Sequence, residues 1–302
     1  MSHTETTGTA GTGGAAGTAS RLAVRKTYKL FIGGAFPRSE SGRTYVVNSA
    51  KGAFLANAAL ASRKDVRDAV GAARKAFGGW SGRTAYNRGQ ILYRVAEMLE
   101  GRRAQFVEEL TALGAPRAKA TAEVDAAIDR WVWYAGWADK LDQVVGSANP
   151  VAGPYLNLTS HQPTGVVGVL APPDAPLLGL VSVVAPVIVT GNTAVVVAAE
   201  DAPLPAITLA EVLATSDLPG GVVNLLTGRA AELAPWLASH MDVNAIDLTG
   251  VPDDLAATCE EAAADNLKRV LRPSPTTWTA DPGLTRLLHF TELKTVWHPT
   301  AP

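Results

Sequence analysis

From Thr164 to Leu271 the chain alternates between short apolar runs and longer helical stretches. The five runs read GVVGVL, TAVVVA, VVNLL, AIDL and LKRVL. Because they are short and lack polar alternation, they are typical of strands that are buried on both faces. Their alternation with helical segments predicts βαβ units. We therefore expect an α/β fold built on a parallel, Rossmann-like sheet with helices on both faces.

A segment of strands and helices precedes this alternation. YKLFIGGAFPR carries the hairpin signal Gly33-Gly34, and TYVVN and FLANAALA are further strand candidates. Ser62 and Asp65 have the spacing of a capping box, with Asp in place of the usual Glu, so we expect a helix to begin there. A later helix, expected over 119–141, carries an aromatic stripe that we interpret as core: Trp131, Tyr134 and Trp137 or Ala138.

The composition excludes several functional classes. The net charge is −1, with 47% apolar and 18% charged residues, so the chain can bury a core and offers no electrostatic case for nucleic acid or an anionic membrane. Its longest apolar candidate, Leu177 to Val189, has about a dozen residues, short of the roughly 18 that a transmembrane helix needs. One cysteine, Cys259, excludes a disulfide framework. We expect a cytoplasmic protein.

Several segments together resemble one known family. They are LFIGGAFPRSESGRTYVVN, DVRDAVGAARKAFGGW, WYAGWADKLD, PTGVVGVLAP, GNTAVVVA, LPGGVVNLLTG and FTELKTVWHP. In this order they resemble the aldehyde dehydrogenase superfamily. That resemblance implies an NAD(P)-binding parallel-sheet domain, a catalytic domain with a nucleophilic cysteine, and an oligomerisation arm made of a hairpin and a tail. It also implies oxidation of aldehydes to acids or thioesters.

The resemblance divides the chain into parts. Residues 27–141 and 164–271 correspond to the NAD(P)-binding-like domain, and residues 142–163 and 284–302 to the oligomerisation hairpin and tail. Residues 1–26 are rich in Gly, Thr and Ala and are expected to be disordered. Residues 272–283 are expected to be a linker that replaces the catalytic domain, because no room for a domain is left there. The catalytic cysteine and glutamate of the family are therefore expected to be missing.

The corner after the first parallel strand is altered as well. The family usually has Pro-Trp-Asn where this chain has Pro172-Pro173-Asp174. The family's asparagine donates a hydrogen bond to the oxyanion, whereas an ionised Asp174 can only accept one and would repel the developing charge. A general-base role is the functional alternative. We expect instead that Asp174 caps a helix that starts at Ala175.

The resemblance also implies a degraded cofactor site. The lysine that binds the adenine ribose aligns with Ala198, and a nearby glutamate function falls on Glu200 or Asp201. Two family glycines are replaced by Ala230 and Ala234. After Thr249 and Gly250, Val251 and Leu255 replace small residues, while Asp253 and Asp254 add negative charge where a phosphate would lie. The vestigial site then comprises Leu170, Pro172, Glu200, Gly228, Thr249 and Gly250. We expect no cofactor, or NAD or NADP if there is one.

Two residue types could supply other chemistry. Cys259 lies on the apolar face of its helix, so we interpret it as a buried structural cysteine and not as a replacement nucleophile. The five histidines are scattered and form no metal-ligand cluster: His3, His161, His240, His289 and His298.

The hairpin and tail are the best-preserved functional feature. The family's tail strand pairs with a sheet of a neighbouring subunit, and this chain lacks the domain that would receive it in a second copy. An unpaired strand carrying Phe290, Leu293, Val296 and Trp297 favours association with another chain. The expected partner is a full-length aldehyde dehydrogenase subunit, in which case the chain is a non-catalytic subunit that stabilises or regulates it; a second copy of this chain is the other expected partner. The alternative is a component that contributes a cofactor domain to a composite oxidoreductase site.

Overall fold

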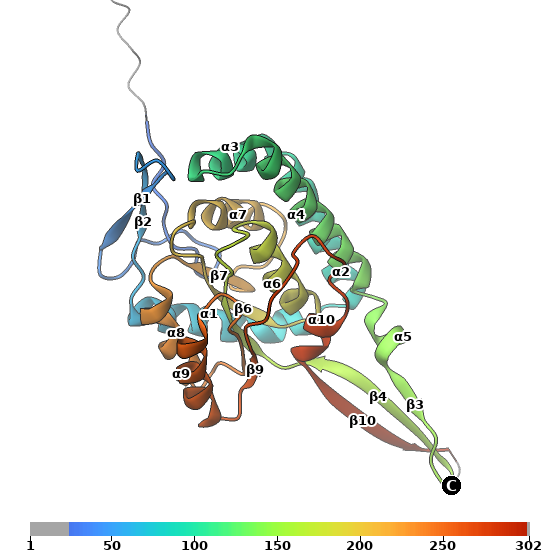
Figure 1. Ribbon diagram of the computed structural model, residues 1–302. Helices are drawn as coiled ribbons and strands as arrows, with labels where there is room; N and C mark the ends of the chain where they lie inside the picture. The colour runs from blue at the N-terminus through green and yellow to red at the C-terminus, as the bar shows by residue number, and fades with distance from the viewer. Residues whose placement is uncertain (1–23, 301–302) are drawn as a thin grey trace, which may run out of the picture.

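The computed structural model describes residues 24–300 and is centred on a five-stranded parallel sheet (Figure 1). Its strands lie in the order β7-β6-β5-β8-β9. Every strand expected from the apolar runs is present, so the predicted fold class is confirmed. The strands are β5 (Val166–Leu170), β6 (Thr193–Val197), β7 (Val223–Leu226), β8 (Ala245–Asp247) and β9 (Arg269–Leu271).

Helices cover both faces of this sheet because its strands direct alternate side chains to opposite sides. In β6, Val195 and Val197 pack into one apolar cluster, with α1 (Arg63–Ser81), α8 (Ala230–Ser239) and α9 (Asp253–Ala264). Ala194 and Val196 pack into the other cluster. That second face is covered by α6 (Leu178–Val189) and α7 (Leu204–Ala214), and then by α2 (Ala85–Glu100), α3 (Arg103–Leu113) and α4 (Arg117–Trp137).

The N-terminal segment forms a small hairpin beside this core. Its strands are β1 (Thr44–Asn48) and β2 (Phe54–Ala59), which pair antiparallel. Before them, Gly33 and Gly34 have φ values of 62° and 86° and make a tight turn. Glycine adopts such positive φ angles without strain, so a pair of glycines suits a turn that needs two of them in succession. The buried Asp65 accepts the Ser62 N–H at 2.7 Å, as the capping-box spacing predicts.

The aromatic stripe of the helix expected over 119–141 is core. Trp131 and Tyr134 are fully buried, as predicted. The helix itself is shorter than expected: α4 ends at Trp137, and a separate short helix, α5 (Leu141–Val145), leads into the next hairpin.

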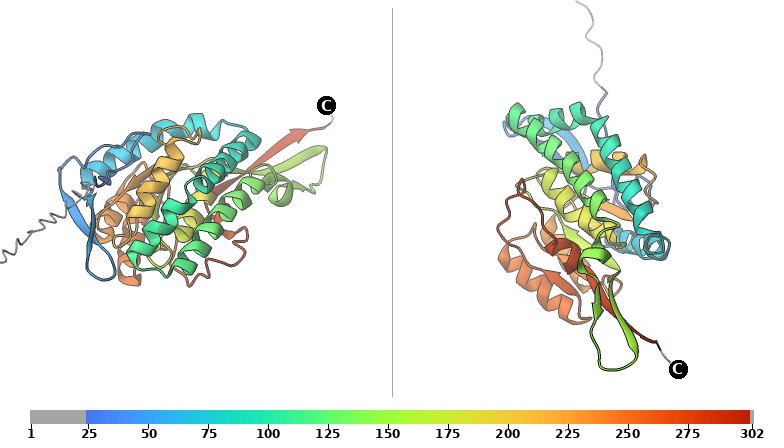
Figure 2. Two further views of the ribbon diagram at one scale, coloured as in Figure 1. Left: turned by 90° about the horizontal axis from the view of Figure 1, so that it is seen from above. Right: turned by 90° about the vertical axis from the view of Figure 1, so that its right-hand side faces the viewer.

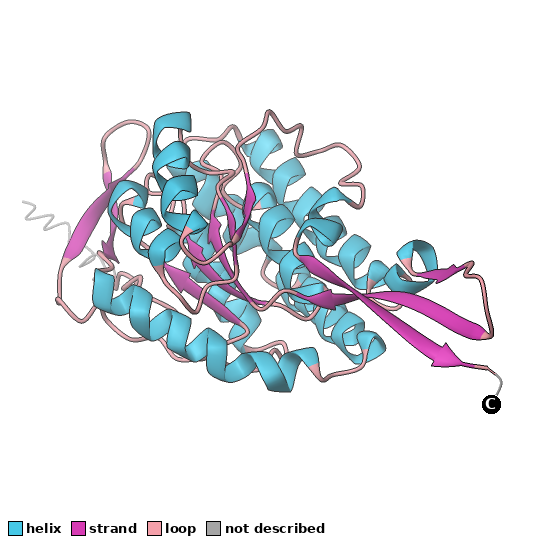
Figure 3. Ribbon diagram, turned by 90° about the horizontal axis from the view of Figure 1, so that it is seen from below, coloured by secondary structure: helices cyan, strands magenta, loops and turns pink. Residues whose placement is uncertain are grey.

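That hairpin and the end of the chain form an arm that projects from the body (Figures 2 and 3). It is a three-stranded sheet in the order β10-β4-β3, with β3 (Ser147–Asn149), β4 (Tyr155–Pro163) and β10 (Thr291–Pro299). The expectation that the tail strand is unpaired within the chain is wrong, because β10 pairs antiparallel with β4 along its whole length. The other edge of β10 pairs with no described strand. Phe290 is also buried and not exposed.

One buried side chain joins the root of the arm to the sheet. Asn192 Oδ1 accepts the Gly165 N–H at 2.8 Å, and Asn192 Nδ2 donates to the Phe290 carbonyl at 2.8 Å. Gly165 lies between β4 and β5, and Phe290 directly precedes β10. The two strands of the arm are therefore fixed together where they leave the body.

Most of the expected disordered tail, 1–23, lies outside the described residues; of its last residues, Lys26 forms an ion pair with Glu211 at 2.9 Å. Within 24–300, none of the helices has both the length and the apolar character that crossing a bilayer takes. No cluster of His, Cys, Asp or Glu suited to a metal ion occurs among the same residues.

Candidate functional site

The strand order reverses between β5 and β8, and open α/β sheets bind ligands at the carboxyl end of such a switch point. The loops that follow these two strands meet there. Gly250 donates its N–H to the Leu170 carbonyl at 3.0 Å. The structure therefore brings together Leu170, Thr249 and Gly250, three residues of the expected vestigial site. Glu200 and Gly228 belong to the loops after β6 and β7, on the other side of β5.

Asp174 lies in this corner but does not cap a helix, so that prediction is wrong. α6 begins only at Leu178. Pro176 disfavours a helical conformation at Ala175, the residue before it, so the helix does not start at Ala175. The carboxylate of Asp174 instead accepts the indole N–H of Trp278, at 3.1 and 3.0 Å. The first amides of α6 are capped by Glu123 of α4, whose Oε1 accepts from Leu177 and Leu178 at 2.9 and 3.2 Å.

A buried ion pair occupies the same edge of the sheet. The side chain of Asp247, at the end of β8, is fully buried, and Arg286 of α10 (Thr285–His289) pairs with its Oδ2. Arg286 also donates to the Thr249 hydroxyl at 3.0 Å, and the Thr249 N–H donates to Asp247 Oδ1 at 3.0 Å. Both polar groups of Thr249 that could face a ligand are therefore bonded within the chain.

Residues 272–290, here called the crossover, bring Trp278 and Arg286 to this corner. Figure 1 shows the crossover leaving β9, running over α6 and returning through α10 to the arm. Arg130 of α4 holds it by donating to the carbonyls of Trp278 and Ala280 at 2.6 and 2.9 Å. A Cβ added at Gly179 would lie 3.5 Å from the Trp278 ring. The expected linker is thus packed on the body across the switch point.

Sequence reasoning missed three members of this cluster: Asp247, Arg286 and Trp278. A signal existed for Asp247, because an acidic residue that ends the apolar run AIDL needs a partner when it is buried. No local pattern identified that partner, since Arg286 lies 39 residues further along the chain.

Comparison with known proteins identifies the family that has this architecture. The sequence model of the aldehyde dehydrogenase family matches residues 36–272. The chain belongs to the aldehyde dehydrogenase family. It is 35% identical over 249 residues to cytosolic aldehyde dehydrogenase 1 of Elephantulus edwardii, covering 80% of this chain and 49% of that protein. It is 37% identical over 251 residues to mitochondrial aldehyde dehydrogenase family 2 member B4 of Arabidopsis thaliana, covering 80% and 45%.

Solved aldehyde dehydrogenase structures share the fold. The NAD-dependent aldehyde dehydrogenase of Sinorhizobium meliloti superposes with a TM-score of 0.78 at 30% identity, over 85% of this chain and 52% of that one. The NAD+ complex of aldehyde dehydrogenase from Bacillus cereus gives 0.76 at 30% identity, over 81% and 50%. The chain thus spans about half the length of these family members.

The two glycines of the expected vestigial cofactor site have structural reasons to be glycine in this family member. A Cβ at Gly250 would lie 2.1 Å from the Ala171 carbonyl oxygen. Gly228 has a φ of 146°, and a Cβ there would lie 3.2 Å from the Ala61 nitrogen. Backbone packing alone therefore explains both residues, and their presence does not by itself indicate a phosphate site.

Two of the positions that were expected to replace cofactor contacts of the family are apolar and buried. They are Ala198, expected at the place of the ribose-binding lysine, and Val251. On the Glu200 side, a cavity of about 370 Å³ is lined in part by Tyr45, Glu200, Asp201 and Arg229. Glu200 and Asp201 both line this cavity, so both remain candidates for the position of the family's glutamate. Burial, with Glu200 nearby, raises the pKa of the Tyr45 hydroxyl, which donates to the Glu200 carbonyl at 3.2 Å.

The single cysteine lies in α9 and is fully buried, as expected. Burial raises the pKa of the Cys259 thiol to about 11, so the thiolate that a nucleophile requires is scarce at neutral pH. The described histidines are dispersed, as expected. His161 bonds the Thr291 hydroxyl inside the arm, and burial lowers the pKa of His289 in α10.

Proposed function

We propose that this chain is a non-catalytic subunit of aldehyde dehydrogenase type, which associates through its arm with a full-length family member and stabilises or regulates it. The observation that carries the proposal is the crossover. It spans the switch point in a short segment and fills it with its own Trp278 and Arg286. The longer relatives have about half of their length outside the matched region.

The chemistry of the corner supports this assignment. Aldehyde oxidation by the family is expected to need a thiolate nucleophile and a donor to the oxyanion. The thiol of Cys259 is buried in α9, and Asp174 presents a carboxylate that already accepts the Trp278 N–H. A carboxylate destabilises a developing oxyanion. This corner therefore supports neither attack on an aldehyde nor stabilisation of its product.

The arm supplies the surface for association. Large apolar side chains are exposed on both of its long strands, and Leu293 and Trp297 on β10 are 67% and 58% exposed. The free edge of β10 offers backbone groups that another strand can pair with. A strand from a partner subunit would cover the edge and the apolar side chains together. The partner that matches by fold is a full-length aldehyde dehydrogenase; a second copy of this chain is the alternative.

Light scattering after gel filtration tests the proposal. The chain is mixed with a full-length aldehyde dehydrogenase from the same organism and compared with each protein alone. We expect a hetero-oligomer that Val296→Glu on β10 abolishes. Val46→Glu is the matched control, because Val46 is a similarly exposed valine on β1. If the two variants behave alike, or if the chain stays monomeric with every such partner, the proposal is wrong.

A second candidate function is supported by the solved relatives, one of which is an NAD+ complex. In that case the chain would contribute a cofactor domain to a composite site, and the cavity beside Glu200 is the part of the cofactor side that remains open. Calorimetric titration with NAD and NADP separates the two functions. Saturable binding that Glu200→Gln weakens would support the composite site, and no binding at millimolar cofactor would exclude it.

A further inference from the structure

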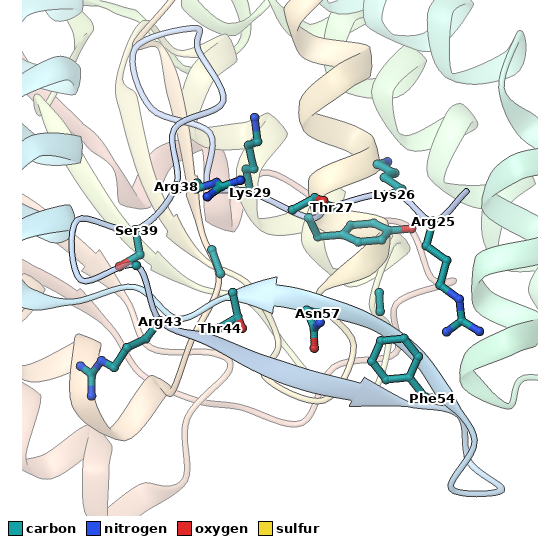
Figure 4. Close-up of a pocket in the computed structure, with 14 residues that line it drawn as sticks. Arg25, Lys26, Thr27, Lys29, Arg38, Ser39, Arg43, Thr44, Phe54 and Asn57 are labelled. Atoms are coloured by element: carbon teal, nitrogen blue, oxygen red, sulfur yellow. The ribbon is translucent and has the colours of Figure 1, made fainter. Parts of the chain in front are cut away.

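A second cavity, of about 330 Å³, lies between the N-terminal segment and the β1–β2 hairpin (Figure 4). It is far from the arm, because the hairpin and the arm lie at opposite ends of the molecule (Figure 2). None of the residues that line it belongs to the crossover or to the loops after β5 and β8. It is therefore separate from the surfaces used in the proposed function.

The lining of this cavity is strongly cationic. Five basic residues line it, and no acidic residue does: Arg25, Lys26, Lys29, Arg38 and Arg43. Such a cluster is unexpected in a chain whose net charge is −1. Like charges that share a cavity repel one another, and a bound anion would relieve that repulsion.

Only one of these cations is neutralised within the described chain. Lys26 pairs with Glu211 at 2.9 Å. Across residues 24–300, none of the other four forms an ion pair. The nearby acids are already engaged: Glu40 pairs with Lys64, and Asp65 accepts the Ser39 hydroxyl. Four positive charges are therefore available to a ligand.

The cavity has two chemically distinct ends. In Figure 4, Arg38 and Arg43 lie at one end and Phe54 lies at the other with Arg25. The Arg25 guanidinium is 4.8 Å from the centre of the Phe54 ring, and this ring is partly exposed. Asn57 lies between the two ends in that view. One end thus suits a group with several negative charges, and the other offers an aromatic face.

We propose that this cavity binds a small polyanion of the di- or triphosphate class, either free or as part of a nucleotide. Phosphate oxygens accept charge-assisted hydrogen bonds from guanidinium and ammonium groups. Lys29, Arg38 and Arg43 supply such donors. A nucleotide would in addition place its base against Phe54.

Calorimetric titration of the full-length chain with sodium tripolyphosphate tests this site. We expect saturable binding that weakens as salt is raised from about 50 to about 300 mM, since partly exposed charges are screened over that range. The double variant Arg38→Gln, Arg43→Gln should bind at least about tenfold more weakly. Both side chains are exposed, so the thermal midpoint should stay near that of the wild type.

The matched control is Lys75→Gln, which removes an exposed cation of α1 that does not line the cavity. It should leave the affinity within about twofold. Titrations with ATP and with adenosine then show whether the site recognises a nucleotide or a polyphosphate. ATP that binds more tightly than tripolyphosphate identifies a nucleotide site, and equal affinity identifies a polyphosphate site. No saturable binding, an equal effect of Lys75→Gln, or binding of adenosine without tripolyphosphate would overturn the proposal.

Discussion

The indole N–H of Trp278 donates to the carboxylate of Asp174, although the two residues lie 104 positions apart. This contact closes the corner where the family fold is expected to hold a reacting group. It also gives the crossover a fixed place on the body. Substitutions at the two residues therefore report on how firmly the crossover is held.

Trp278→Phe removes the hydrogen bond and keeps most of the packing against Gly179. We expect a loss of about 0.5–1 kcal/mol in the free energy of unfolding, because the contact is exposed to solvent. Trp278→Ala should cost about 2 kcal/mol or more, since the ring is lost as well. Urea denaturation measures both. Asp174→Asn keeps an acceptor and serves as the control; equal losses for Phe and Ala would contradict this account.

The ion pair between Arg286 and Asp247 should matter more. Arg286→Gln leaves the fully buried Asp247 without its cation, and such a change costs about 3 kcal/mol. Adding Asp247→Asn removes the stranded charge, so the double variant should be more stable than Arg286→Gln alone. A double-mutant cycle in urea should give a coupling energy of about 1 kcal/mol or more. Additive effects would show that the pair does not hold the crossover.

Glu123 caps α6 from another helix. Glu123→Ala leaves the Leu177 and Leu178 amides without their acceptor, so we expect a loss of about 1–2 kcal/mol in the free energy of unfolding. Glu123→Gln retains one acceptor oxygen and should lose about half as much. Thermal or urea unfolding provides the measurement. If Asp174→Ala proves the more damaging change, the cap has been assigned to the wrong residue.

Cys259 should make stability fall at alkaline pH. Burial raises the pKa of its thiol from 9.0 to about 11, so between these values the unfolded chain loses the thiol proton and the folded chain keeps it. The stabilising contribution is complete below pH 9 and decreases as the pH rises to 11, by up to about 1.4 kcal/mol per pH unit. Cys259→Ala removes this term. Urea unfolding between pH 8 and pH 11 should show a steeper decline for the wild type; parallel curves would refute it.

The fold could be predicted further than the site. Short apolar runs predicted all five strands of the parallel sheet, because strands covered on both faces are rich in apolar residues. β5, β6, β7 and β8 are indeed fully buried, whereas the edge strand β9 exposes Arg269. The corner could not be predicted in the same way. Whether Asp174 caps α6 depends on where that helix begins, and the capping acid comes from α4. The partners of Asp174 and Asp247 lie in the crossover, and only the folded chain brings them together.

The strand pairing in the arm could not be predicted from the sequence either. Its strands have a recognisable alternating pattern, yet the sequence does not say which strand pairs with which. Residues 155–163 and 291–299 pair in register although more than a hundred residues separate them. Once the body has folded, Asn192 holds the roots of both strands together, and their pairing becomes local in space.

The attachment of the arm has a mechanical consequence. β4 ends at Pro163 and β5, the central strand of the parallel sheet, begins at Val166, so only two residues separate a protruding lever from the middle of the sheet. A pull on the tip would load β5 along its length, against the hydrogen bonds to both of its neighbours. When a strand is pulled along its own direction, the hydrogen bonds to its neighbours are loaded at the same time and have to break together. Whatever binds the arm therefore pulls on a strand that is hydrogen-bonded to neighbours on both edges.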